Sequence, residues 1–202
     1  IAIALSPDGR LVVFVGTRGT VTQLYVRGLD HVEAKQVPGT EGATEVFFSP
    51  DGAWIGFRAD NKIKKVPAAG GPPATISSVP EGSNWGASWG DDGTIFFAGQ
   101  AGISRVSSAG GTPVTVTTPD AVNGERHLLP KPLPGGRAIL FTTMNSVESE
   151  TANVVLQSLD NAEERVLIPG GADARYVSTG HLVYMRTGTL MAVPFDVQSR
   201  QV

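Results

Sequence analysis

The residues best suited to chemistry lie in the second half of the chain. His127 directly follows Glu125 and Arg126, so a side chain that exchanges protons near neutral pH stands beside an acid and a permanent cation. We expect this group to make polar contacts to a ligand; the alternative is a histidine that is hydrogen-bonded within the fold. Lys131 and Arg175 could form a positive spot for an anionic ligand, or could be solvated charges.

Aromatic and acidic side chains add fewer candidates. The ring of Trp85 could stack on a sugar or peptide ring. Glu148 and Glu150 lie among Ser, Thr and Asn residues, where solvation is the ordinary state of a carboxylate. Nothing in the sequence selects an acid pair of the glycosidase type.

The patterns of common catalytic and metal sites are not expected in this chain. The histidines at 31, 127 and 181 have no partner two or four positions away, which metal-ligand spacing on one strand or helix would need. We predict that a Gly-x-Ser-x-Gly nucleophile elbow and a phosphate-cradling glycine loop are both absent. The prediction is therefore no catalytic residue, no metal site and no cofactor.

The composition limits the classes of partner. The chain has 202 residues, a formal net charge of −3 and no cysteine, so it offers no basic footprint for nucleic acid and no disulfide framework. No apolar run reaches the roughly 20 residues that cross a bilayer, so no direct membrane insertion is expected. The chain begins at Ile1 without an initiator Met or a signal-peptide pattern, and we expect it to be part of a longer protein.

Turn sequences recur along the chain at nearly constant spacing. Ser6-Pro7-Asp8-Gly9 returns as Ser49-Pro50-Asp51-Gly52, and degenerate copies end at Gly93, Gly136 and Gly180. The aligned glycines are 43, 41, 43 and 44 residues apart. Proline presets φ, aspartate bonds backbone amides and glycine accepts positive φ, so the aspartates are turn formers. A period of this length is typical of a repeat protein.

A short apolar run follows each aligned glycine. These runs are β-branched and aromatic and are bounded by turn residues, which is typical of strands; they lie at 11–14, 54–57, 95–97, 139–141 and 182–184. Further strands are expected at 23–26, 62–66, 103–106, 154–156 and 190–193. Outer segments such as 113–116, together with the strand that enters each turn, bring the number to four per repeat. No amphipathic helix is found.

Four strands in about 40–45 residues are the signature of a propeller blade. The sequence therefore predicts an all-β protein, a β-propeller of five four-stranded repeats of about 43 residues, with the last blade incomplete. The single domain spans 1–202, with repeats at approximately 1–42, 43–83, 84–126, 127–170 and 171–202. Because residues 199–202 are too few for a fourth strand, the ring either closes by packing blade five on blade one or is completed by a second chain. Unpaired strand edges favour the second case, a homo-oligomer.

The sequence resembles the WD-repeat-like propellers of the TolB type. The likeness is carried by the Ser-Pro-Asp-Gly turns, by residues 66–71 and 85–93, and by residues 190–196. It is similar to propellers attached to bacterial serine/threonine kinases and to TolB-like regulators, and it covers essentially the whole chain. Such relatives usually have six or more blades, and this sequence has five. The resemblance implies an extracytoplasmic location, in the periplasm or at the cell surface.

The propeller architecture gives each candidate residue an expected place. Loops that lead into the innermost strands share a face with the loops between strands two and three, and ligands usually meet this face around the central channel. We expect Trp85, Glu125, Arg126, His127, Lys131 and Arg175 at that channel mouth. The loops at 119–127 and 143–152 are longer than their counterparts, a modest pointer to function. Trp89 and Tyr176 occupy apolar repeat positions and are expected to pack between blades.

The favoured function is a non-enzymatic module that senses a ligand or binds a protein in a bacterial protein. A protein or small molecule would bind at the channel mouth, held by variable loops on rigid blades. One alternative is a propeller-scaffold hydrolase of the lactonase or glycosidase type. Another is the gating propeller of a prolyl-oligopeptidase-like enzyme.

Overall fold

The described part of the chain is built from strands alone. The computed structural model describes residues 2–80, 85–145 and 152–202. Within these ranges the strands form five antiparallel sheets that follow one another in chain order, and no helix is present. The predicted all-β propeller with five blades is therefore confirmed.

Each of the first four sheets contains four strands that neighbour one another in chain order. The first sheet contains β1 (Ile3–Leu5), β2 (Leu11–Arg18), β3 (Val21–Gly28) and β4 (Lys35–Gln36), and the second β5 (Glu45–Phe48), β6 (Trp54–Ala59), β7 (Lys62–Pro67) and β8 (Ala74–Ser78). The third contains β9 (Ala87–Trp89), β10 (Thr94–Gly99), β11 (Gly102–Ser107) and β12 (Val114–Thr115). The fourth contains β13 (Arg126–Pro132), β14 (Ala138–Met144), β15 (Asn153–Ser158) and β16 (Glu164–Pro169).

The fifth sheet contains three strands, β17 (Ala172–Val177), β18 (His181–Arg186) and β19 (Thr189–Pro194). This agrees with the prediction that the last blade is incomplete. The outer edge of β19 has no neighbouring strand among the described residues. The chain end instead turns toward the fourth sheet, where Arg200 lies 3.5 Å from Asp160.

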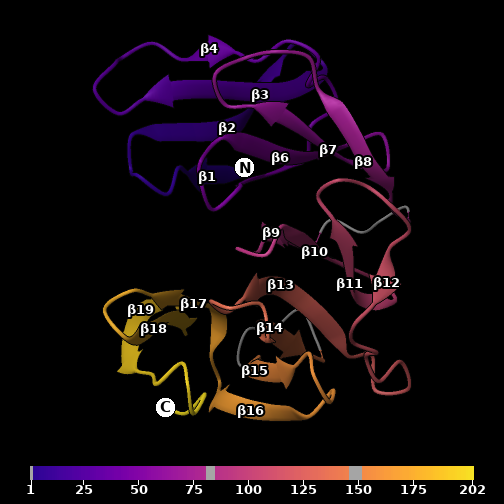
Figure 1. Ribbon diagram of the computed structural model, residues 1–202, viewed down its shortest axis with the longest axis vertical. Helices are drawn as coiled ribbons and strands as arrows, with labels where there is room; N and C mark the ends of the chain where they lie inside the picture. Colours follow the sequence, from indigo (N-terminus) through magenta and orange to yellow (C-terminus); the bar gives the residue numbers. More distant parts are fainter. Residues whose placement is uncertain (1, 81–84, 146–151) are drawn as a thin grey trace.

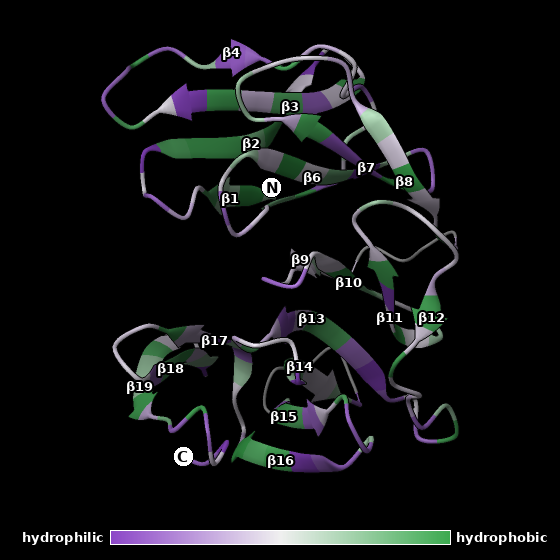
Figure 2. Cartoon of the chain, viewed as in Figure 1, coloured by the Kyte–Doolittle hydropathy of each residue, from purple (hydrophilic) through white to green (hydrophobic). Residues whose placement is uncertain are grey.

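The first strand of each sheet lies toward the centre and the last strand toward the rim (Figure 1). The first strands contact one another in order, β1 with β5, β5 with β9, β9 with β13 and β13 with β17. Figure 2 shows hydrophobic residues along strands such as β2 and hydrophilic residues on the outer strand β4. The first strands therefore lie around the centre of the propeller.

The Ser-Pro-Asp-Gly turns join the first two strands of the first two blades. Ser49 Oγ donates a hydrogen bond to Asp51 Oδ1 and accepts one from the Trp54 amide at 2.9 Å. Asp51 also accepts a hydrogen bond from the Ala53 amide at 3.0 Å. Gly52 has a φ of 71°, which glycine adopts without a steric penalty. These bonds account for the recurrence of the motif without any chemical role for its aspartates.

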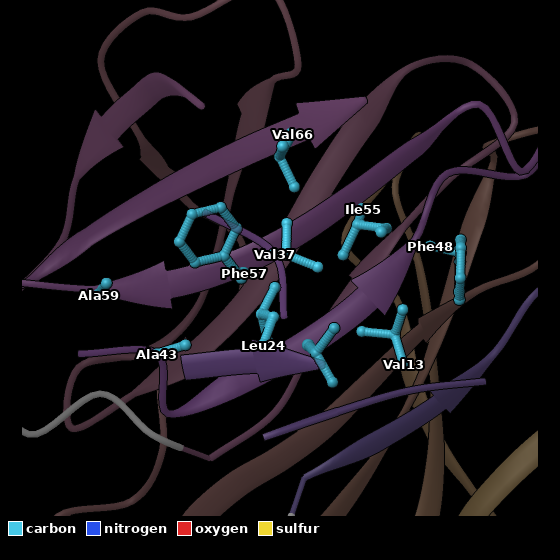
Figure 3. Close-up of a cluster of buried hydrophobic side chains, with 10 residues drawn as sticks. Val13, Leu24, Val37, Ala43, Phe48, Ile55, Phe57, Ala59 and Val66 are labelled. Carbon is cyan, nitrogen blue, oxygen red and sulfur yellow. The ribbon is translucent and has the colours of Figure 1, made fainter. Parts of the chain in front are cut away.

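The hydrophobic core is divided among the interfaces between consecutive blades. One cluster joins the first two sheets, with Val13, Leu24, Ile55 and Phe57 at its centre (Figure 3). Three further clusters join the second sheet to the third, the third to the fourth and the fourth to the fifth. Among the described residues no such cluster joins the fifth sheet to the first. Blade-on-blade burial in chain order therefore stabilises the propeller.

Two sheet faces retain exposed apolar side chains. Ile3 and Leu5 of β1 are 65% and 56% exposed, and Leu190 of β19 is 67% exposed. They belong to the first and last sheets, which pack against a neighbour in chain order on one side only. In the described residues no helix is long and apolar enough to cross a membrane.

Candidate functional site

One repeat position places a side chain from each of three blades around one cavity. Ser88, Lys131 and Arg175 each stand five residues before the aligned glycine of their repeat, and all three line the same hollow. Because successive side chains of a strand point to opposite faces, Glu45, two residues earlier still in its repeat, is expected on the same side of β5 as Phe47. On β17 a bulge between Ala172 and Arg175 interrupts this alternation, and Asp173 is placed instead by its hydrogen bond with Arg175. The position in the repeat therefore indicates which side chains line this cavity.

The cavity has a volume of about 290 Å³ and opens beside the turns that join first and second strands. The inner strands β9, β13 and β17 supply most of its wall. Its lining residues are Pro50, Ser88, Trp89, Gly90, Asp91, Lys131, Pro132, Leu133, Pro134, Arg175 and Tyr176. It therefore combines two cations, one carboxylate, the hydroxyls of Ser88 and Tyr176 and two aromatic rings in one small space.

Two carboxylate–arginine pairs lie near Lys131 of this cavity. Arg175 donates a hydrogen bond to Asp173 at 3.0 Å, and Arg58 Nε lies 3.9 Å from Glu45 Oε2. Burial raises the pKa of Glu45, and the charges of Arg58 and Lys131 oppose that rise. Each acid is thus matched by an arginine on its own blade.

Lys131 is left without a counter-ion of its own. Its ammonium group makes no hydrogen bond and no ion pair with the residues that the structure describes. Burial lowers the pKa of Lys131, as does the nearby Arg175, while Asp173 and Glu45 act in the opposite direction. A cation held in this way gains from any anion that enters the cavity.

Ser88 corrects one sequence prediction. Residues Gly86 to Gly90 do carry the Gly-x-Ser-x-Gly spacing, so the predicted absence of that spacing is wrong. The spacing falls on strand β9, whereas a nucleophile elbow needs a sharp turn from a strand into a helix. Ser88 is 8% exposed, and its hydroxyl makes no hydrogen bond within the described residues.

The other predicted residues gather at the opposite end of strand β13. The Arg126 guanidinium lies 5.2 Å from the centroid of the Trp85 ring, a cation–π contact. The Trp85 carbonyl accepts a hydrogen bond from the Leu129 amide at 2.8 Å, which ties the loop before β9 to β13. Arg126 is exposed and Trp85 half-buried, so this pair lies on the loop face of the propeller.

His127 is a buried part of this group. It is 1% exposed, its Nδ1 lies 2.7 Å from Thr117 Oγ1, and its ring centroid lies 4.8 Å from that of Phe141. Its Nε2 lies 3.5 Å from Glu125 Oε2 and makes no hydrogen bond with the described residues. Burial lowers the pKa of His127, and Glu125 partly opposes this. These contacts favour the hypothesis that His127 is hydrogen-bonded within the fold over the hypothesis that it contacts a ligand.

The six predicted residues therefore form two groups at the two ends of β13. Trp85, Glu125, Arg126 and His127 lie at the loop end, and Lys131 and Arg175 at the turn end. Sequence reasoning did not single out Glu45, Ser88 and Asp173 as site residues, although their repeat positions contain the signal. The predicted long loop at 143–152 falls largely on residues 146–151, with Glu148 and Glu150, which lie outside the described residues.

A larger hollow of about 780 Å³ lies along the first sheet, between residues 9–11 and 26–35. Exposed turn residues form much of it, including Asp30 and His31, which pair at 2.6 Å. It contains no buried polar atom that lacks a partner among the described residues. In the described ranges no three His, Asp or Glu side chains converge as metal ligands would. We therefore take the smaller cavity between the inner strands as the candidate site.

Comparison with known proteins bears on the fold. The chain superimposes on TolB from Acinetobacter baumannii with a TM-score of 0.69 and 18% identity, covering 97% of this chain and 54% of that protein. The β-propeller domain of Cps50 (Swd1) from Myceliophteria thermophila gives a TM-score of 0.69 and 10% identity, covering 98% of this chain and 66% of that one. A chain of the nidogen/laminin complex gives 0.68 and 10%, covering 100% and 77%.

The fold is that of a TolB-like β-propeller. The resemblance seen in the repeat motifs thus agrees with the structure. No protein-family profile matches the sequence, and no curated protein matches it. The chain spans about half of the TolB structure to which it is similar. Identities at this level support the fold and leave function to the site.

Proposed function

We propose that this chain is a non-enzymatic propeller module that recognises a ligand or a protein partner along its central channel. The carrying observation is that one cavity is lined by Lys131, whose ammonium has no hydrogen bond or ion pair among the described residues, and by Ser88, whose buried hydroxyl has no hydrogen bond among them. Leaving a buried hydroxyl such as that of Ser88 without a partner costs about 1–3 kcal/mol. A ligand that supplies the missing partners recovers that free energy, which accounts for such groups at a binding surface.

The loop end of β13 extends the proposed recognition surface. Arg126 and Trp85 present a cation stacked on an aromatic ring, a combination enriched at binding hot spots. His127 supports this surface from below through its contacts with Thr117 and Phe141. We propose that the loop end and the turn end act as two contact regions of one channel.

The setting of the module is part of the proposal. The likeness to TolB-type propellers supports a bacterial, extracytoplasmic protein, in the periplasm or at the cell surface. The composition supports a protein or small-molecule partner rather than binding to nucleic acid or insertion into a membrane. The proposal needs no cofactor.

The test is a binding screen by saturation-transfer NMR against organic acids, amino acids, dipeptides and small sugars. It uses the wild type, Trp85→Ala for the loop end, Lys131→Met for the turn end, and Lys62→Met as a control, since Lys62 is exposed on β7. We expect at least one class of compound to bind the wild-type protein. The binding signal should be lost in one of the two channel variants and kept in Lys62→Met. Binding that persists in both channel variants would contradict the proposal.

A second arm addresses the hydrolase alternative directly. Ser88 and Lys131 line one cavity, and a serine beside a lysine base is a known nucleophile arrangement. We expect no release of p-nitrophenol from p-nitrophenyl acetate above that of the Ser88→Ala variant. Turnover that Ser88→Ala abolishes, in a protein that melts at the wild-type temperature, would replace the proposed binding module with an enzyme.

A further inference from the structure

The cavity beside the turns contains one cation, Lys131, that has no ion-pair partner among the described residues. Asp173 bonds to Arg175 at 3.0 Å and Glu45 faces Arg58 at 3.9 Å, so these charges are matched within their own blades. Asp91, on the wall, accepts a hydrogen bond from the Gly135 amide at 2.9 Å. Lys131 alone lacks a partner among the described residues. The Lys131 ammonium is therefore the cation in this cavity that is free to pair with an incoming anion.

The same cavity offers a hydrogen-bond donor next to that charge. Ser88 Oγ is buried and makes no hydrogen bond with any described residue. A hydroxyl donates to a carboxylate oxygen, and an ammonium donates to a carboxylate in a charge-assisted hydrogen bond. One carboxylate has two oxygens and can satisfy both groups at once.

Aromatic rings and prolines form the apolar part of the cavity wall. Trp89 packs edge-on against Phe47, with ring centroids 6.3 Å apart, and Tyr176 packs in the same way against Phe195 at 6.2 Å. These contacts fix the two rings before any ligand arrives. Pro50, Pro132 and Pro134 complete the wall and add surface without a donor of their own. Rigid aromatic surfaces of this kind bind planar rings by stacking.

We propose that this cavity binds a small monocarboxylate that carries one flat apolar ring, with the carboxylate on Lys131 and Ser88 and the ring against Trp89 and Tyr176. This inference rests on the proposed function and specifies the ligand at its turn end. A volume of about 290 Å³ is at the lower limit of small-molecule sites, so it suits a single ring. The ligand could be a free aromatic acid or the carboxyl-terminal aromatic residue of a peptide.

A dianion is disfavoured by the surrounding acids. The first negative charge neutralises Lys131, and a second would face the carboxylates of Asp91, Asp173 and Glu45 without a free cation. Like charges at short distance in a partly buried site repel strongly. The cavity therefore selects for one charge as well as for the ring.

The experiment is a calorimetric titration with benzoate, alongside benzamide, terephthalate and acetate as probes that change one property each. We expect benzoate to bind about tenfold or more tightly than neutral benzamide, the size of one charge-assisted hydrogen bond. Terephthalate and acetate should be weaker as well. N-acetylphenylalanine and its amide distinguish a peptide terminus from a free acid.

Variants test the assigned residues. Lys131→Met should reduce benzoate affinity about tenfold and Ser88→Ala a few-fold, while Lys131→Arg should retain most of it and Lys62→Met all of it. Equal binding of benzoate and benzamide, or benzoate binding that survives Lys131→Met, would overturn the inference. If benzoate fails but another compound binds through Trp85, the monocarboxylate assignment falls and the proposed function stands.

Discussion

At the scale of single residues, the turn serine illustrates how much a short motif stabilises. Ser49 is 3% exposed and its hydroxyl joins Asp51 to the first amide of β6. Removing it leaves the Trp54 amide and the Asp51 carboxylate without that partner. Ser49→Ala should lower the free energy of unfolding by about 1–2 kcal/mol in urea denaturation. Ser178→Ala is the control, because Ser178 is an exposed serine that makes no hydrogen bond with the described residues. An equal loss of stability in this variant would show that the hydrogen bonds of Ser49 do not stabilise the turn.

His127 gives the chain a pH-dependent contribution to stability. Burial lowers its pKa in the folded state below the ordinary value of 6.5, so near that pH the unfolded chain binds the proton more readily. This contribution is complete above about pH 6.5 and is lost as the pH falls toward the folded-state pKa. The melting temperature of the wild type should therefore fall more steeply from pH 7 to pH 5 than that of His127→Gln.

The glutamine variant should also be less stable at pH 7, by about 1–3 kcal/mol, because the bond to Thr117 and the contact with Phe141 are weakened. His31→Gln serves as the control, since His31 lies exposed in a turn. Parallel pH profiles for the wild type and His127→Gln would show that His127 does not set this dependence. The two pH profiles are compared with each other, because the raised pKa of buried Glu45 changes the stability with pH in the opposite direction. This effect is present in both proteins and cancels in the difference.

At the scale of elements, the regular parts of the fold could be predicted and the irregular parts could not. The aligned glycines and apolar runs predicted the second strands, because hairpin turns need positive φ and strand burial needs alternation or continuous apolar runs. The incomplete last blade was predicted because residues 199–202 are too few for a fourth strand. Which end of an inner strand a side chain reaches depends on local register. Bulges between Leu128 and Lys131 and between Ala172 and Arg175 shift that register and redirect the side chains that follow. Sequence spacing alone does not reveal them.

Two equivalent hairpins provide a test of close backbone packing. Gly102 begins β11 with a φ of 104°, and a Cβ there would lie 2.1 Å from the Thr117 carbonyl oxygen. Gly19, in the same hairpin of the first blade, has a φ of 63° and nothing within 4 Å of its Cβ direction. Gly102→Ala should cost about 3 kcal/mol or more and Gly19→Ala about 1–2 kcal/mol. Equal losses of unfolding free energy for the two variants, measured by chemical denaturation, would contradict the close packing of Thr117 against Gly102.

At the scale of the whole molecule, stability and association both follow from the chain of blade interfaces. Buried clusters join consecutive sheets, while β19 presents an outer edge of Leu190, Met191, Ala192 and Val193 without a charge. Apolar, uncharged edges pair readily with other strands. Homo-oligomerisation through such an edge remains a prediction. Sedimentation equilibrium should show association that Leu190→Lys weakens and that Val166→Lys, on the charged outer strand β16, leaves unchanged. A chain that stays monomeric at all concentrations would contradict it.

We propose that the inner strands form the recognition surface. The most direct test of this claim is an amide chemical-shift map recorded while the best binder from the screen is titrated into the labelled protein. The largest shifts should fall on β5, β9, β13 and β17 and on the residues that line the turn-end cavity. Shifts confined to outer strands such as β4, β12 and β16 would contradict the claim and move the site to the rim.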